Sequence, residues 1–397
     1  MSTTDTGNVI GLVEPGFEGV RAAFAANFAA GHEVGAALCV HVKGRKVVDV
    51  CGGSFDREGT VPYGPDALQL VFSSTKGATA ACANLLAQRG LLDLDAPVAD
   101  YWPEFARAGK AALPVRFLLC HQAGLPAIDR ALTPEEVQAW DPVIDALAAQ
   151  APFWEPGTAH GYHALTYGYL VGEVVRRISG RSLGTFFAEE VAGPLGLEFF
   201  IGLPPALEPR VSPVVAAPIG GAAQGGEGYA STLLARALNM GGAFRDRVWM
   251  NRPAWHAAEV PGGNGITNAT SLSRLYAGLV GTVEGGPPEP LLTPEQVEEA
   301  RTVLTFGEDR VFSSVGFTLK QKIGLGFWRA SPAATWGGPG SFGHGGAGGS
   351  YGFADPENQL AVGYVMNKMA EGVVVDPRSP GIVTAIYAAL GAAAKYV

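Results

Sequence analysis

The pattern of hydrophobic and polar positions divides the 397-residue chain into a strand-forming start, a helical middle and a strand-forming end. Near the start, Phe17, Val20 and Phe24 recur at helical spacing, which predicts an amphipathic helix over about 15–30. Two apolar runs then flank the turn Lys43-Gly44-Arg45 and predict a β-hairpin. The strands predicted in this part are 35–42, 46–51 and 68–72.

The middle of the chain is expected to be helical, because apolar residues recur every three to four positions between Pro and Gly turns. A Pro-, Gly- and Ala-rich stretch at 204–228 predicts a long ordered loop or crossover. The helices predicted here are 73–88, 114–120, 134–149, 166–179, 183–192, 230–240 and 271–280.

Strand-like patterns return only near the end of the chain. They lie at 322–328, 344–354 and 359–366, before a last predicted helix at 382–394. The fold class that follows is α+β: an antiparallel sheet formed from both chain ends, flanked by helices, with an inserted and mostly helical domain. The expected domains are 1–72 with about 310–397 for the sheet, and about 73–309 for the helices and crossovers. The active site is expected between them.

Composition excludes several classes of partner. Hydrophobic residues make up 47% of the chain and charged residues 16%, which is typical of a folded globular protein. The net charge is −9 and no basic stripe is available to neutralise phosphates, so we expect no nucleic-acid partner. The N-terminal residues lack a basic and apolar leader, and the apolar run at 272–280 is short and interrupted. We therefore expect no membrane span and a cytoplasmic location.

Cysteine and histidine spacing gives no indication of a metal site. Cys39, Cys51, Cys82 and Cys120 lie among apolar neighbours without Cys-x-x-Cys or Cys/His spacing, so we expect four small buried side chains. No His-Glu-x-x-His motif is present, and we expect no metal and no cofactor.

The motif Ser73-Ser74-Thr75-Lys76 supplies the first candidate nucleophile. Its spacing places Ser73 and Lys76 one helical turn apart on the same face. A helix N-terminus favours the negative charge of an attacking alkoxide, and a lysine near burial has a lowered pKa and can accept the serine proton. The alternative is an N-cap serine followed by a solvated lysine, and the bare motif does not decide between them.

A second serine lies in Gly348-Gly349-Ser350-Tyr351-Gly352, which matches G-x-S-x-G. A nucleophile elbow requires a strand, a sharp turn and then a helix. A turn and another strand-like run follow Gly352, so Ser350 is not expected to be the nucleophile.

Six motifs follow one another along the chain: FSSTKG at 72–77, LLCHQAGLP at 118–126, PGTAHGYHA at 156–164, TYGYLVGEVV at 166–175, GHGGAGGS at 343–350 and YVMN at 364–367. The motifs span 72–367, and the resemblance that they support extends over about 35–367. In this order they resemble the serine β-lactamase and penicillin-binding-protein superfamily, and most of all the class C β-lactamase-related esterases, also called family VIII carboxylesterases.

The resemblance implies a catalytic role for three side chains. Ser73 would be the nucleophile, and Tyr162, in the place of the tyrosine of the family's Y-x-N motif, would act with Lys76 as the proton relay. The alternative for Tyr162 is a half-buried aromatic residue with a structural hydrogen bond. How the proton is shared between Lys76 and Tyr162 stays open. The same match implies an oxyanion hole formed by the backbone N–H groups of Ser73 and Ala347.

Two departures from the family pattern affect the expected substrate. His344-Gly345-Gly346 takes the place of K-T-G, and we expect these three residues to contact the substrate, with His344 able to donate a hydrogen bond; the alternative is a structural histidine. Ala164 takes the place of the asparagine of Y-x-N. Because the chain lacks both the lysine and the asparagine of the family pattern, we expect its substrate to be an ester and not a β-lactam.

The predicted function is a carboxylesterase that acts on small or short-acyl esters through a Ser73 acyl-enzyme. His121 is expected to lie in a packed turn without a catalytic role. The alternatives are a β-lactamase or DD-peptidase, an acyltransferase that passes the acyl group to an alcohol, and an inactive binding protein on the same fold. The presence of Ser73, Lys76 and Tyr162 together counts against the inactive protein.

Overall fold

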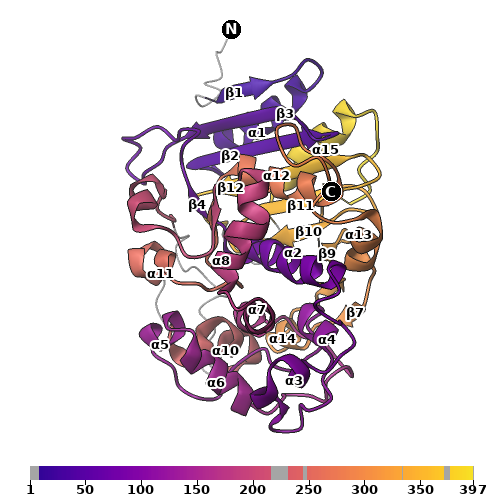
Figure 1. The fold of residues 1–397 in the computed structure, drawn as a ribbon. Helices are drawn as coiled ribbons and strands as arrows, with labels where there is room; N and C mark the ends of the chain where they lie inside the picture. The colour runs from indigo at the N-terminus through magenta and orange to yellow at the C-terminus, as the bar shows by residue number, and fades with distance from the viewer. Residues whose placement is uncertain (1–8, 216–230, 245–247, 333, 371–375, 397) are drawn as a thin grey trace.

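A nine-stranded sheet organises the molecule (Figure 1). The computed structural model describes residues 9–215, 231–244, 248–332, 334–370 and 376–396. Within them, the strands pair antiparallel in the order β1-β3-β2-β12-β11-β10-β9-β8-β7. Their bounds are β1 (Ile10–Val13), β2 (Gly35–Val42), β3 (Arg45–Gly53), β7 (Thr305–Glu308), β8 (Lys320–Ile323), β9 (Trp328–Arg329), β10 (Phe342–Gly345), β11 (Tyr351–Asp355) and β12 (Leu360–Met366).

The two ends of the chain meet in the centre of this sheet. β2 pairs with β12 along its whole length, from the pair of Val42 with Leu360 to the pair of Ala36 with Met366. This pairing confirms the predicted α+β fold class, in which both chain ends form one antiparallel sheet. The division into two domains at residue 72 and about residue 310 stays a prediction.

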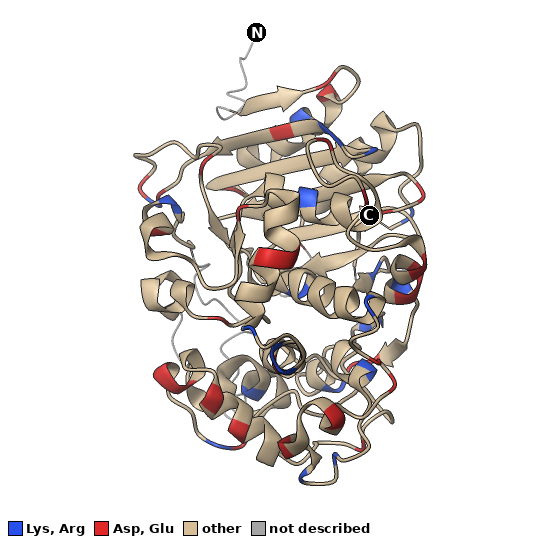
Figure 2. Cartoon of the chain, in the orientation of Figure 1, with Lys and Arg blue, Asp and Glu red and all other residues tan. Residues whose placement is uncertain are grey.

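Apolar cores cover both faces of the sheet. On one face, helices α1 (Glu18–Ala29) and α15 (Arg378–Ala389) bury Phe24, Ile382 and Ile386 against the strands. On the other face, α12 (Ala269–Val280) and α2 (Thr75–Gln88) join the main core. Figure 2 shows charged positions mainly on helices and loops, while most of the sheet carries none, as expected for strands that are buried on both faces.

In the lower half of Figure 1 the helical middle of the chain gathers around α7, and α2 lies between α7 and the sheet. No helix among the described residues is long and apolar enough to cross a membrane. The remaining helices are α3 (Val98–Tyr101), α4 (Val115–Leu119), α5 (Pro134–Gln138), α6 (Asp141–Ala149), α7 (Thr166–Ser179), α8 (Leu183–Phe187), α9 (Gly193–Leu195), α10 (Leu233–Asn239), α11 (Pro253–Ala257), α13 (Pro294–Arg301) and α14 (Arg310–Ser313).

Three predicted elements are divided in the structure, and the last predicted helix is displaced. The strand expected at 322–328 is two short strands, β8 and β9, with residues 324–327 between them, and the helix expected at 382–394 is α15, which begins and ends earlier. The helix expected at 134–149 is divided into α5 and α6 at Trp140, which has a φ of +68° and whose indole N–H donates to Glu173 Oε2 at 2.9 Å. The strand expected at 344–354 is a hairpin of β10 and β11, because Gly348 and Gly349 have positive φ and reverse the chain. The loop expected at 204–228 lies partly outside the described residues, and its start forms a 3-10 turn at Pro205–Arg210.

Candidate active site

A short turn holds Ser73 in front of α2. The strand β4 (Gln69–Leu70) pairs with β6 (Ile266–Thr267), and Phe72–Ser74 then form a 3-10 turn before α2 begins at Thr75. Phe72 has a φ of +47°, a left-handed conformation that costs about 1–2 kcal/mol for a residue with a Cβ. The turn is held from outside, because Val71 N–H donates to Gly265 O at 3.0 Å and Gly265 N–H donates to Thr75 Oγ1 at 2.8 Å.

Lys76 is fully buried behind Ser73. Its ammonium nitrogen lies 3.0 Å from Ser73 Oγ and 2.6 Å from each of two backbone oxygens, Ala164 O and Gly262 O. Within the described residues no carboxylate pairs with Lys76, and burial lowers its pKa well below the ordinary value. The amine can therefore be neutral at physiological pH and accept the Ser73 proton.

Tyr162 lies against both residues of this pair. Lys76 Nζ is 4.9 Å from the centroid of the Tyr162 ring, and Ser73 is near enough to the Tyr162 phenol to lower the pKa of the phenol. Burial raises the pKa of Tyr162 above its ordinary value, and the effect of the neighbouring Ser73 opposes this only in part. The phenol is therefore neutral in the resting site and can donate a proton. Phe312 and Trp328 pack on the same ring, with centroids 5.8 and 5.7 Å away.

The turn between β10 and β11 is docked on the Ser73 turn by Ser350 and Gly346. Ser350 Oγ donates to Val71 O at 2.8 Å and lies 3.1 Å from Ser74 Oγ. A Cβ on Gly346 would lie only 2.2 Å from Val71 O, so this close approach requires glycine. Ser350 is therefore a structural residue of this turn, and a strand rather than a helix follows it.

Ala347 is the exposed residue of this turn. Among the residues that the structure describes, no acceptor receives a hydrogen bond from its N–H. A free N–H in a turn that is docked on the Ser73 turn has the chemistry of an oxyanion-hole donor. Gly345, by contrast, has room for a side chain, since an added Cβ would meet Trp336 at an ordinary contact distance of 3.6 Å.

His344 differs from the hydrogen-bond donor that was expected. Its side chain is fully buried, burial lowers its pKa well below the ordinary value, and its Nδ1 donates to Gly345 O at 2.7 Å. A neutral imidazole that donates through Nδ1 carries a lone pair on Nε2. Nε2 is buried and has no hydrogen-bond partner in the described ranges, so this nitrogen is an acceptor instead of the expected donor. Its ring lies 4.4 Å from Trp328.

The structure thus brings Ser73, Lys76, Tyr162 and the 344–347 segment together. Sequence reasoning missed the carbonyl groups of Ala164 and Gly262, because a backbone acceptor leaves no mark in the identity of its residue. It also missed Phe312 as a neighbour of Tyr162. An aromatic residue on a short helix carries no signal that distinguishes it from core.

Two expectations about packing, for His121 and for the cysteines, agree with the structure. His121 lies in a packed turn with a φ of +63°, and its Nδ1 accepts from His163 N–H at 3.2 Å. The four cysteines are free and buried. In the part of the chain that the structure describes, no group of three or more His, Cys, Asp or Glu side chains could hold a metal ion.

The chain is similar to known proteins along nearly its whole length. Residues 20–383 match the family model described as Beta-lactamase. Esterase/beta-lactamase LipL of Mycobacterium tuberculosis (strain ATCC 25618 / H37Rv) is 35% identical over 367 residues, which cover 90% of this chain and 82% of LipL.

Two solved structures share both sequence and fold with this chain. A family VIII carboxylesterase is 37% identical, with a TM-score of 0.86 over 96% of this chain and 100% of that chain. A penicillin-binding protein homologue from Caulobacter crescentus is also 37% identical, with a TM-score of 0.84 over the same shares. The family match covers most of the sequence, and this chain therefore belongs to the Beta-lactamase family.

Proposed function

We propose that this protein is a carboxylesterase that hydrolyses small or short-acyl esters through an acyl-enzyme on Ser73. The observation that carries the proposal is the fully buried Lys76 amine, 3.0 Å from Ser73 Oγ. The family match and the similarity to Esterase/beta-lactamase LipL and to a family VIII carboxylesterase support a hydrolase of the esterase/beta-lactamase type.

In the proposed acylation, neutral Lys76 takes the Ser73 proton while Ser73 Oγ attacks the ester carbonyl carbon. The N–H groups of Ser73 and Ala347 stabilise the negative oxygen of the tetrahedral intermediate. The intermediate collapses to the acyl-enzyme, and the leaving alkoxide takes a proton from Tyr162. The Lys76 ammonium then returns a proton to Tyr162. Water attacks the acyl-enzyme in the same way, and the products are an acid and an alcohol.

The opposite effects of burial on the two side chains support this division of labour. Burial lowers the pKa of Lys76 and raises that of Tyr162. The lysine therefore releases its proton more readily than usual and the phenol holds its proton more strongly. Lys76 fits the role of resting base, and Tyr162 that of acid toward the leaving group.

The uncharged side chain at position 344 favours a substrate without a carboxylate. His344 carries no charge and offers a lone pair, so position 344 lacks a cation that could bind a β-lactam carboxylate. Phe312 and Trp328 form an apolar wall beside Tyr162, which suits the apolar parts of an ester. A β-lactamase activity is the second candidate, since LipL is described as both an esterase and a beta-lactamase.

A panel of p-nitrophenyl esters of increasing acyl length tests this proposal, with a chromogenic cephalosporin as the control substrate. We expect the highest kcat/KM for acetate or butyrate and at least about a hundredfold lower value for the cephalosporin. Ser73→Ala should lower ester turnover by roughly 10⁴-fold or more, as for loss of the nucleophile in other serine hydrolases. Ester turnover that survives Ser73→Ala, or equal rates on the cephalosporin, would contradict the proposal.

A further inference from the structure

A buried arginine lies behind the turn that carries Ala347. Arg378 is the first residue of α15 and its side chain is only 2% exposed. Its Nη1 donates to Lys368 O at 2.8 Å, and its Nε donates to Asp376 Oδ1 at 2.8 Å. Glu33 Oε2 lies 3.3 Å from Nη1. The guanidinium is therefore held in place by groups from three separate segments of the chain.

The remaining nitrogen of Arg378 faces the turn itself. Nη2 donates to Gly348 O, an oxygen that also accepts from Ala370 N–H at 3.0 Å. A Cβ on Gly349 would lie 2.0 Å from the same nitrogen, so the turn packs directly onto the guanidinium. Gly346 is fixed against Val71 on the other side. Ala347 thus lies between Gly346, which is docked on the Ser73 turn, and Gly348, which is held by Arg378.

The charged groups around Arg378 are energetically costly to bury, which indicates that they fix the position of the turn and do not add to stability. Burial raises the pKa of Glu33 to about 8, although the Arg378 charge opposes the rise. Buried ion pairs add little net stability compared with apolar packing, but charge-assisted hydrogen bonds such as that from Arg378 to Asp376 have well-defined geometry. Arg378 makes directed bonds to two carbonyl groups and to carboxylates on both of its sides.

We propose that Arg378 is a positioning residue of the oxyanion hole, which holds the Gly348 carbonyl so that the Ala347 N–H points at the oxygen of the reacting carbonyl group. This inference rests on the proposed function, because it requires Ala347 to bind the developing oxyanion. It adds a contribution from α15, which contains no residue that touches the substrate in the proposed mechanism.

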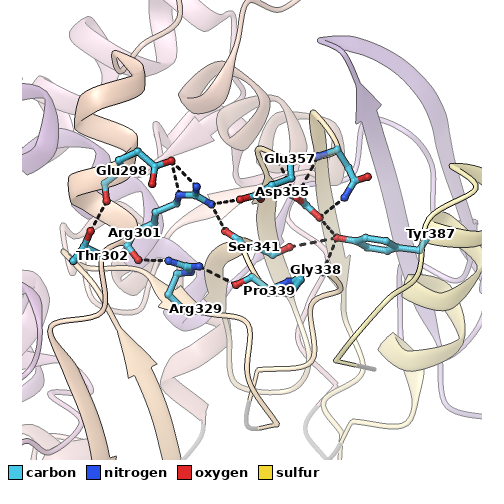
Figure 3. Close-up of polar contacts among 12 residues, drawn as sticks. Glu298, Arg301, Thr302, Arg329, Gly338, Pro339, Ser341, Asp355, Glu357 and Tyr387 are labelled. Carbon is cyan, nitrogen blue, oxygen red and sulfur yellow. Dashed lines mark hydrogen bonds and ion pairs between the residues drawn. The ribbon is translucent and has the colours of Figure 1, made fainter.

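The other end of the same hairpin provides a matched control (Figure 3). Arg301 Nη1 donates to Gly340 O at 3.0 Å and pairs with Glu357 at 2.7 Å, and its side chain is 13% exposed. Asp355 and Tyr387 complete this cluster, where β10 begins and β11 ends. Arg301 therefore clamps a carbonyl group as Arg378 does, but at the end of the hairpin away from Ser73.

The experiment compares Arg378→Lys with Arg301→Lys in the full chain, using p-nitrophenyl acetate. We expect Arg378→Lys to lower kcat at least about tenfold with KM changed less than about twofold, because an oxyanion donor acts mainly in the transition state and a whole donor contributes 10²–10³-fold. The rate of labelling by a fluorophosphonate should fall with kcat. Arg301→Lys should leave kcat and KM within about twofold, and the Tm of each variant shows how much stability it has lost.

A second variant keeps the test decisive if Arg378→Lys does not fold. Asp376→Asn preserves the shape of the side chain that accepts from Arg378 Nε, but removes its charge. It should also lower kcat with little change in KM. A folded Arg378→Lys variant with wild-type kcat would overturn the inference, and so would an equal loss of kcat in Arg301→Lys. If Arg378→Lys does not fold, wild-type kcat in Asp376→Asn would overturn it. A wild-type protein without Ser73-dependent ester hydrolysis would instead reject the proposed function.

Discussion

At the residue scale, a comparison of two buried lysines shows that burial lowers the pKa of a lysine but does not by itself make the lysine catalytic. Lys110 is also fully buried, and its Nζ donates to Arg107 O, Ala148 O and Gln150 O at 2.9, 3.0 and 2.6 Å. Burial lowers the pKa of Lys110 to about 8. Lys76 differs because one of its three partners is a serine hydroxyl instead of a carbonyl group. A lowered lysine pKa is therefore no catalytic signature unless a nucleophile lies within reach.

The contact between Ser73 and Lys76 could be predicted, because side chains three residues apart lie on the same face of a helical turn. Tyr162 could not be predicted from spacing. It lies 86 positions beyond Lys76 in the sequence, and only the resemblance to a family connected the two. The neutral tautomer of His344 depends on a carbonyl group in its own turn, which residue identity does not encode.

Tyr162→Phe tests the phenol separately from the ring. Phenylalanine retains the packing on Phe312 and Trp328 but cannot protonate the leaving alkoxide. We expect kcat to fall by roughly 10²–10⁴-fold, the usual contribution of a general acid or base, with Tm nearly unchanged. In the control Tyr169→Phe, loss of the bond to Val137 O should cost about 1 kcal/mol of stability and leave kcat intact. Equal activity of the two variants would contradict the role of Tyr162.

The pH dependence of kcat/KM tests the role of Lys76 as resting base. Burial lowers the Lys76 pKa, and only the neutral amine can accept the Ser73 proton. Activity should therefore fall by about tenfold per pH unit below that pKa and reach a plateau above it. The position of this acid limb should stay the same in His344→Asn, because the neutral His344 does not supply the proton acceptor. A limb that disappears in His344→Asn would assign the titration to the histidine.

At the scale of elements, the hairpin of β10 and β11 could not be predicted from the pattern of hydrophobic and polar residues. Its sequence was expected to form one strand, because the glycines between His344 and Tyr351 carry no hydrophobic alternation that would locate a turn. The turn is set by Gly348 and Gly349 at positive φ and by bonds to Val71 and Arg378 from distant segments. Trp140 divides a predicted helix for a similar reason, because its partner Glu173 lies on α7.

Ser350→Ala tests whether this hairpin uses its serine for structure or for chemistry. Loss of the Ser350 bond to Val71 O should lower the free energy of unfolding by about 1–2 kcal/mol, because a buried acceptor loses its donor. We expect kcat to stay above about a tenth of the wild-type value. Urea unfolding and ester kinetics on the same samples measure both effects. A loss of activity as complete as that of Ser73→Ala would make Ser350 the nucleophile.

At the scale of the whole molecule, strand patterns at both ends of the chain sufficed to predict one sheet made from both ends. The two edge strands were missed. In β1, Ile10 and Leu12 are 52% and 42% exposed, and in β7 Phe306 is 62% exposed. These strands are four residues long and bury too little apolar surface to produce a clear alternation.

Asn367 tests how the two chain ends are joined. Its Oδ1 accepts from Gly35 N–H at 2.8 Å, and its Nδ2 donates to Ser54 O at 2.8 Å and lies 3.1 Å from Ser212 Oγ. Asn367→Ala should lower the free energy of unfolding by about 3 kcal/mol, as expected for several buried bonds lost together. The control Asn358→Ala loses one bond within the turn that joins β11 and β12, and should cost about 1 kcal/mol or less. Denaturant unfolding that ranks the two variants equally would contradict this account.

The most direct test of the Ser73 acyl-enzyme is to locate the covalent adduct of a fluorophosphonate by peptide mass spectrometry. In the native protein we predict one adduct per chain on Ser73, formed in proportion to the loss of ester hydrolysis. Ser73→Ala and the unfolded wild-type chain should carry none. An adduct on Ser350 or on another residue, or complete inactivation without modification of Ser73, would contradict the central claim.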